Sequence, residues 1–162
     1  MSRLPKVITV VLISSAAAFG QASATKKATL PDILIARAQE WVDTWNNKDV
    51  KRMRALHAAD VADQLYGIGE EFGTVDKLLD GIARENYWNL SWSIKIVEPR
   101  VRLLGPDAAL VAFRLIGDET NSDGRSRRYS GAYSLIFQRE KKVWKVIHVH
   151  SSHGPVPGTP SQ

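Results

Sequence analysis

The hydrophobic and polar positions of the chain follow two different periods. Between residues 29 and 86, apolar residues recur at spacings of three and four, which predicts amphipathic helices. From Ser93 onward they alternate with polar residues, which predicts β-strands. The pattern therefore predicts an α+β domain, in which three helices precede a curved antiparallel sheet of four long strands.

Caps define where the predicted helices begin. Thr29 caps the first helix, Pro31 lies in its first turn, and the apolar face ends near residues 46–47. Asp49 can cap a short second helix, and Thr74 a third. Residues 58–73, between the second and third helices, have mixed polarity and several glycines. We expect a loop there, with one short strand at 64–68.

Turn residues separate the predicted strands. Pro99 interrupts the first strand and indicates a bulge or a sheet edge. Gly105-Pro-Asp107 predicts a turn, residues 118–124 a polar hairpin loop, and residues 140–142 the last turn. The predicted strands are 93–104, 108–117, 127–139 and 143–154.

The last strand is the stretch on which the functional interpretation depends. Strict alternation assigns its residues to two faces. One face carries Trp144, Val146, His148 and His150, and the other carries Lys145, Ile147, Val149 and Ser151. A bulge of one residue would exchange the two faces.

Residues 1–24 have the pattern of a signal peptide. Arg3 and Lys6 form its basic region, Val7–Phe19 its apolar core, and residues 22–24 a small-residue cleavage site before Thr25. The apolar run of 13 residues is short of the roughly 20 needed to span a bilayer. We therefore expect export to the bacterial periplasm or the medium, and no membrane span.

Composition adds little about partners. Without residues 1–24 the chain has 20 basic and 17 acidic residues, a net charge of +3, and no cysteine. The expected organisation is a single domain at 25–153 and a disordered tail at 154–162, where no periodicity remains.

Four stretches resemble the association (hub) domain of calcium/calmodulin-dependent protein kinase II, a branch of the NTF2-like, SnoaL-like superfamily. They span most of residues 30–152 and are Asn47-Lys-Asp49, Trp88-Asn-Leu90, Gly105-Pro-Asp-Ala-Ala-Leu-Val-Ala-Phe113 and Trp144-Lys-Val-Ile-His-Val-His-Ser-Ser152. The resemblance implies a cone-shaped fold with a pocket on the concave side of the sheet. It also implies dimers or rings assembled through the convex side.

In the kinase hub, a histidine and arginines in the pocket accept small carboxylates. The resemblance places that histidine on Ala83 and the arginines on Leu115, Leu135 and Ser151, none of which is basic. A carboxylate bound there would lose its hydration, and without a cation nothing would offset the free-energy cost of that loss. We therefore expect either a small, neutral and largely apolar ligand or a pocket filled by its own side chains.

Strand parity extends this prediction to other residues. The predicted pocket residues are Trp45, Tyr66, Trp88, Phe113, Leu115, Tyr133, Val149 and Ser151, and Trp92 lies near the predicted mouth. The opposite face carries Arg114, His148 and His150, which we expect at an interface between copies of the chain.

Three sharper chemical interpretations stay open. Asp60, Asp63 and Tyr66 could form an acid–base site of the kind that isomerases, cyclases and lyases of SnoaL-like or ketosteroid-isomerase-like type use, although a solvated loop explains them as well. His148 and His150, with His153 beyond them, could supply zinc ligands, but no carboxylate or cysteine at an obvious spacing accompanies them.

The basic cluster Arg125-Ser-Arg127-Arg128 could contact nucleic acid, but hairpin ends are often as charged.

Our leading hypothesis is an exported oligomerisation module with no cofactor, no metal and no nucleic-acid partner. The alternatives are a cofactor-free acid–base enzyme, or an assembly protein with a closed cavity.

Overall fold

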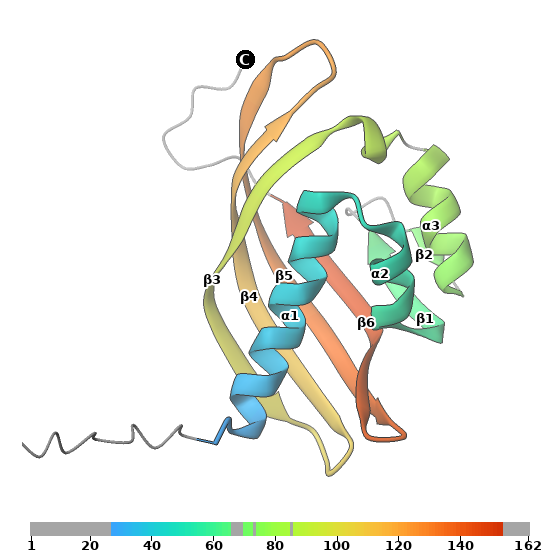
Figure 1. The fold of residues 1–162 in the computed structure, drawn as a ribbon, viewed down its shortest axis with the longest axis vertical. Coiled ribbons are helices and arrows are strands. Elements are labelled where there is room, and N and C mark those ends of the chain that lie inside the picture. Colours follow the sequence, from blue (N-terminus) through green and yellow to red (C-terminus); the bar gives the residue numbers. More distant parts are fainter. Residues whose placement is uncertain (1–26, 66–69, 73, 85, 154–162) are drawn as a thin grey trace, which may run out of the picture.

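The computed structural model describes residues 27–153 apart from 66–69, 73 and 85 (Figure 1). The predicted signal peptide and tail lie outside these residues. The elements are α1 (Leu30–Asn47), α2 (Val50–Leu56), β1 (His57–Leu65), β2 (Glu70–Phe72), α3 (Val75–Arg84), the short 3₁₀ helix η1 (Tyr87–Asn89), β3 (Ser91–Leu103), β4 (Ala108–Thr120), β5 (Ser126–Glu140) and β6 (Val143–His153).

The predicted caps form as expected. The Thr29 hydroxyl accepts from the backbone N–H of Asp32, whose carboxylate accepts from the Thr29 N–H at 2.9 Å, so α1 begins with a capping box. The Asp49 carboxylate accepts the Arg52 N–H at 2.9 Å. Thr74 accepts the Lys77 N–H at 3.2 Å before α3. The helix starts are therefore encoded locally.

The sheet has six strands in the order β2-β1-β6-β5-β4-β3. Its antiparallel part, β3 to β6, is the predicted meander of four long strands. The prediction of a loop at 58–73 was wrong, because β1 occupies the first half of it and pairs with β6 in parallel, and β2 occupies residues 70–72. That pairing joins segments about 90 residues apart, which local periodicity cannot indicate.

Both predicted effects of Pro99 are present. Strand β3 is the last in the sheet order, and its register against β4 shifts between Val97 and Arg100. Proline has no backbone N–H to donate, so an edge strand with a bulge tolerates it.

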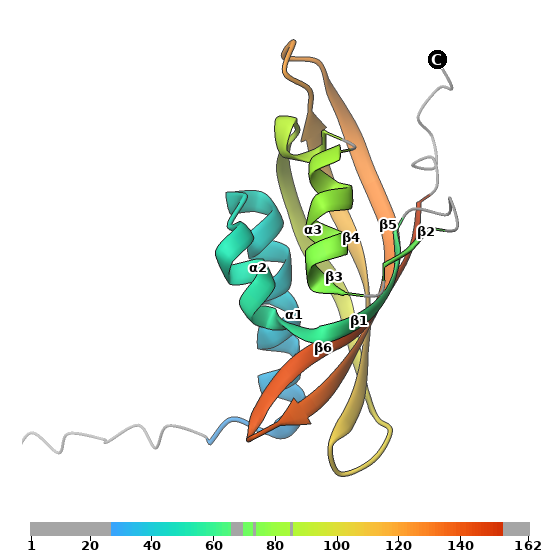
Figure 2. The same cartoon turned by 90° about the vertical axis from the view of Figure 1, so that its right-hand side faces the viewer.

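The described α-helices α1, α2 and α3 lie over the concave face of the sheet (Figures 1 and 2). Helix α1 packs against β3, and α3 against β1. The buried core between the layers includes Leu34, Val42, Val111, Leu135 and Phe137. No described helix covers the opposite, convex face, which Figure 2 shows on the side away from α1 and α2. None of the helices described is long and apolar enough to cross a bilayer.

Candidate functional site: an aromatic cavity inside the sheet

Strand β6 contains a bulge that decides which residues face the cavity. Phe137 pairs with Val146, but the preceding Ile136 pairs with His148, so Ile147 is an extra residue. Strict alternation along the whole strand, which placed Trp144 and Val146 on the same face as His148 and His150, was therefore wrong. Trp144 and Val146 are buried before the bulge, and Val149 and Ser151 are buried after it, all on the inner face.

Aromatic rings fill the inner face between α1 and the sheet. Trp41 and Trp45 lie one helical turn apart, with ring centroids 5.8 Å apart. Trp45 also contacts Trp92 of β3 edge-on at 6.4 Å, and Trp92 contacts Tyr129 of β5 at 5.2 Å. Trp41 meets Tyr133 at 5.9 Å and closes the ring of contacts. Edge contacts of this kind match the quadrupoles of the rings and hold them in fixed orientations.

A cavity of about 10 Å³ remains among these rings. This volume holds about one water molecule. The hollow predicted from the sequence is thus largely occupied by its own side chains. The described residues that line it are Trp41, Trp45, Trp92, Ile94, Leu115, Tyr129 and Tyr133.

The side-chain amide of Asn46 fixes the distance between α1 and the edge strand. It donates to the Ile94 carbonyl at 2.9 Å and accepts the Ile94 N–H at 3.0 Å. Asn46 therefore occupies the place of a missing strand partner, and it holds Trp45 and Ile94 on opposite walls of the cavity.

Some polar atoms at this cavity are hydrogen-bonded and others are not. The hydroxyls of Tyr129 and Tyr133 are hydrogen-bonded to each other. The indole N–H groups of Trp45 and Trp92 are buried and have no hydrogen-bond partner among the described residues. Natural proteins seldom leave buried donors unpaired, so an acceptor beside either group would be stabilised.

Ser151 also has a buried hydroxyl, for which the described residues offer no hydrogen-bond partner. We predict that Ser151→Ala leaves the free energy of unfolding unchanged or raises it by up to about 1 kcal/mol, because it removes an unsatisfied group. Thr44→Val is the matched control, since the Thr44 hydroxyl donates to the Trp41 carbonyl at 2.7 Å and its loss should cost about 1 kcal/mol. Urea unfolding curves of both variants test this. Equal losses would contradict the assignment of Ser151 as unpaired.

His57 lies behind the cavity and was not singled out from the sequence. Its Nδ1 lies 2.8 Å from the Met53 carbonyl, which only accepts, so Nδ1 carries the proton. Its Nε2 then accepts from the Trp41 indole N–H at 3.4 Å. The pKa of His57 is lowered from 6.5 to about 4, chiefly because burial disfavours the charged form; the Met53 hydrogen bond opposes this shift and the charge of Lys145 contributes to it. His57 is thus a neutral residue that orients Trp41.

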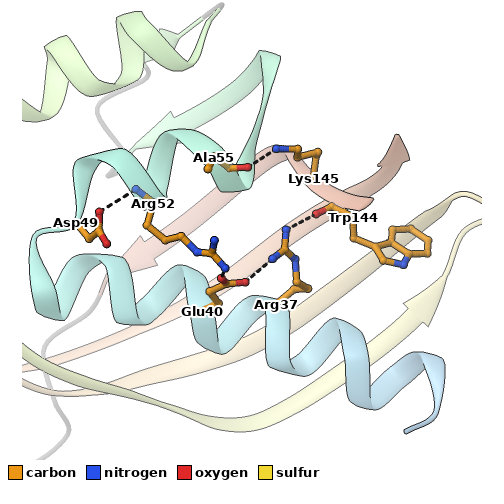
Figure 3. A network of polar contacts seen from close by, with 7 residues as sticks. All are labelled: Arg37, Glu40, Asp49, Arg52, Ala55, Trp144 and Lys145. Carbon is orange, nitrogen blue, oxygen red and sulfur yellow. Dashed lines mark hydrogen bonds and ion pairs between the residues drawn. The ribbon is translucent and has the colours of Figure 1, made fainter. Parts of the chain in front are cut away.

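A polar network ties the first two helices to the start of β6 (Figure 3). Glu40 forms ion pairs with both Arg37 and Arg52. Arg37 also donates to the Trp144 carbonyl at 3.0 Å, and Lys145 donates to the Ala55 carbonyl. Partial burial lowers the pKa of Arg37 below its usual value. These contacts join α1 and α2 to β6 and hold the helices against the sheet, so we assign the network a structural role.

The predicted pocket residues divide into three groups. Trp45, Leu115 and Tyr133 line the cavity. Phe113, Val149 and Ser151 are buried on the same inner face but behind the lining, with Phe113 stacked on Tyr133 at 5.8 Å. Trp88 is half-buried and stacks on Trp45 at 5.7 Å. Tyr66 lies outside the described residues.

The cavity residues not predicted as a site were Trp41, Ile94 and Tyr129. Each shares a face with a residue that was considered. Trp41 lies one helical turn before Trp45, and Tyr129 lies four residues before Tyr133 on a strand. Extending the periodicity by one step from those neighbours could have found them.

The predicted interface residues are on the convex face. Arg114 pairs with Ala132, His150 with Ser134, and His148 with Ile136, opposite the aromatic side. Arg114 and His150 are exposed and His148 is half-buried. The described residues contain no group of three or more histidine or acidic side chains placed to hold a metal.

The structure places the two acidic residues and the basic cluster singled out from the sequence in surroundings that differ from those predicted. Asp60 and Asp63 lie within β1, not in a loop, and the backbone of Asp63 pairs with Val149. Each arginine of the basic cluster forms an ion pair with an acidic residue, and these pairs are Arg125–Asp123, Arg127–Glu119 and Arg128–Asp118. The cluster is therefore a neutralised hairpin end.

The arrangement of helices followed by a curved sheet around an inner hollow defines an NTF2-like protein. An NTF2-like protein from Cytophaga hutchinsonii superposes with a TM-score of 0.64 at 15% identity, covering 78% of this chain and 99% of that one. A ketosteroid isomerase-like protein from Erwinia carotovora atroseptica superposes with a TM-score of 0.67 at 16% identity, covering 76% and 95%. At this identity the likeness shows the fold alone.

Within that class, the chain belongs to the calcium/calmodulin dependent protein kinase II association domain family, which matches residues 33–155. A protein from Xanthomonas campestris described as such a domain superposes with a TM-score of 0.66 at 20% identity, covering 83% of this chain and 97% of that one. A search of curated proteins finds no significant match. The resemblance noted in the sequence is therefore confirmed at the level of family and fold.

Proposed function

We propose that this chain is an exported self-association module, in which the convex face of the sheet pairs with the same face of a second copy. The observation that carries the proposal is the composition of that face. Its centre, on the adjacent strands β4 and β5, consists of small or aliphatic side chains, namely Ala112, Ala132, Ser134 and Ile136. No described helix covers them.

Small side chains at the centre favour sheet-on-sheet contact. Two sheets pack face to face at about 10 Å, a distance that bulky charged groups between them would prevent. Strand β5 lies between β4 and β6, so Ala132 and Ser134 are at the middle of the patch. A patch that pairs with itself about a two-fold axis gives a closed dimer, the commonest symmetric oligomer. The family name supports the same conclusion.

A pair of matched substitutions tests the proposal. Ala132→Glu places a carboxylate at the centre of the patch, where pairing would bring it close to the same charge on the partner. We expect it to weaken dimerisation at least tenfold by sedimentation velocity. Ala83→Glu makes the same change at an exposed position on α3 and should leave the mass unchanged. Identical masses for both variants and the unaltered chain would contradict the proposal.

A second candidate is cofactor-free acid–base chemistry in the aromatic cavity. The paired hydroxyls of Tyr129 and Tyr133 favour it, because hydroxyls beside a cavity can stabilise a developing oxyanion. Such chemistry also needs a base within reach of the substrate. The described lining residues include no carboxylate or imidazole, so self-association has the stronger support.

A further inference from the structure

Beyond self-association, we propose that the aromatic cavity binds a neutral oxygen acceptor, held by the indole N–H groups of Trp45 and Trp92. The two rings come from different elements, α1 and β3, and line the same cavity. Their exposed fractions are 4% and 9%, and within the part of the chain that the structure describes neither N–H has a hydrogen-bond partner. Because indole nitrogen only donates, both groups require an acceptor.

The walls determine the charge of that acceptor. Every described lining side chain is uncharged, so an anion would lose its hydration without gaining a cationic partner. A cation would face two unpaired donors. A neutral oxygen avoids both costs and can accept two hydrogen bonds through its lone pairs. Ile94 and Leu115 provide apolar walls for the carbon atoms of a small ketone or amide.

The size of the cavity allows two sources of this oxygen. The volume of about 10 Å³ admits one water molecule without change. A small carbonyl compound offers the same acceptor, but it must displace that water and move the walls apart. The shared chemistry is a single neutral oxygen between two indole donors.

Side-chain nuclear magnetic resonance separates the two sources. The chain has five tryptophans, so a ¹⁵N-labelled sample gives five indole N–H signals, and Trp45→Phe and Trp92→Phe assign the relevant pair. The probe is cyclopentanone, and its matched control is methylenecyclopentane, which has the same shape without the oxygen. Trp144→Phe is the control variant, because Trp144 is buried against the Arg139 side chain and does not line the cavity.

We expect cyclopentanone to shift the Trp45 and Trp92 signals saturably and to bind at least tenfold more tightly than methylenecyclopentane. Each of the two cavity variants should weaken cyclopentanone binding at least tenfold, whereas Trp144→Phe should not. If cyclopentanone shifts neither signal but both N–H groups show cross-relaxation with a long-lived water, the proposal holds with water as the source.

Two results would overturn the proposal. One is equal binding of the ketone and the hydrocarbon with no change in either indole signal. The other is no response to either probe together with no contact from water. Sedimentation of the same samples keeps this test separate from self-association, because Trp45 and Trp92 lie on the inner face and their variants should retain the mass of the unaltered chain.

Discussion

Gly117→Ala is expected to destabilise the fold by more than about 3 kcal/mol, a large share of the stability of a typical domain. A β-carbon at Gly117 would lie 2.0 Å from the Ser93 carbonyl oxygen and 2.8 Å from the Ile94 Cα. Both contacts are with backbone, so no rotamer change relieves them. Gly117 pairs with Ile94 and with Tyr129, which places the close approach directly beside the cavity.

The measurement is urea unfolding, with Gly105→Ala as control. A β-carbon at Gly105 meets nothing within 4 Å, so that variant should stay within about 0.5 kcal/mol of the unaltered chain. A Gly117→Ala protein as stable as Gly105→Ala would show that β3 and β4 are farther apart than described. The chemical shift of the Trp92 indole N–H should also move toward the value of an unfolded chain as the protein is destabilised.

The stability of the protein is expected to fall as the pH decreases from about 6.5 to about 4. His57 has a pKa of about 4 when folded and an ordinary value of 6.5, so the unfolded chain binds more protons in this window. Its contribution is complete above pH 6.5 and is lost as the pH falls toward the folded pKa. The difference corresponds to about 3 kcal/mol.

Unfolding free energies at several pH values, compared with His57→Gln, test this assignment. Glutamine can still donate and accept but does not titrate, so the variant should lose most of the dependence between pH 6.5 and 4. His148→Gln, the same substitution on the convex face, should retain it because His57 is intact. An unaltered slope in His57→Gln would contradict the assignment of a buried, neutral imidazole.

Local signals were sufficient for most of the fold. The caps at Thr29, Asp49 and Thr74 determine helix starts within a few residues, and period-two alternation defines the four long strands. Strand β1 could not be predicted in the same way. Its sequence, His-Ala-Ala-Asp-Val-Ala-Asp-Gln-Leu, contains a single β-branched residue, and its pairing with β6 is formed only in the tertiary structure.

The face of the sheet on which the candidate site lies could be predicted from the sequence, but the bulge beside it and the size of its cavity could not. The family resemblance implied the inward placement of Leu115 and Ser151, and strand parity extended it to Tyr133. The bulge at Ile147 has no glycine or proline to mark it, since it arises from the pairing with Ile136 and Phe137. The small size of the cavity depends on how four tryptophans on α1, η1 and β3 pack together. Distances between side chains on separate elements are not encoded in periodicity.

The inner and outer faces of the sheet therefore have different expected roles. The inner face is closed by aromatic packing and retains two unpaired donors. The outer face presents small side chains bordered by Arg114 and His150. Substitutions on one face should leave the property of the other unchanged, because the backbone layer of the sheet separates them.

The most direct test of the account is the mass of the unaltered protein in solution, measured by sedimentation equilibrium over a range of concentrations. We predict twice the mass of one chain, with dissociation only on dilution. A single-chain mass at every concentration would contradict the proposed self-association.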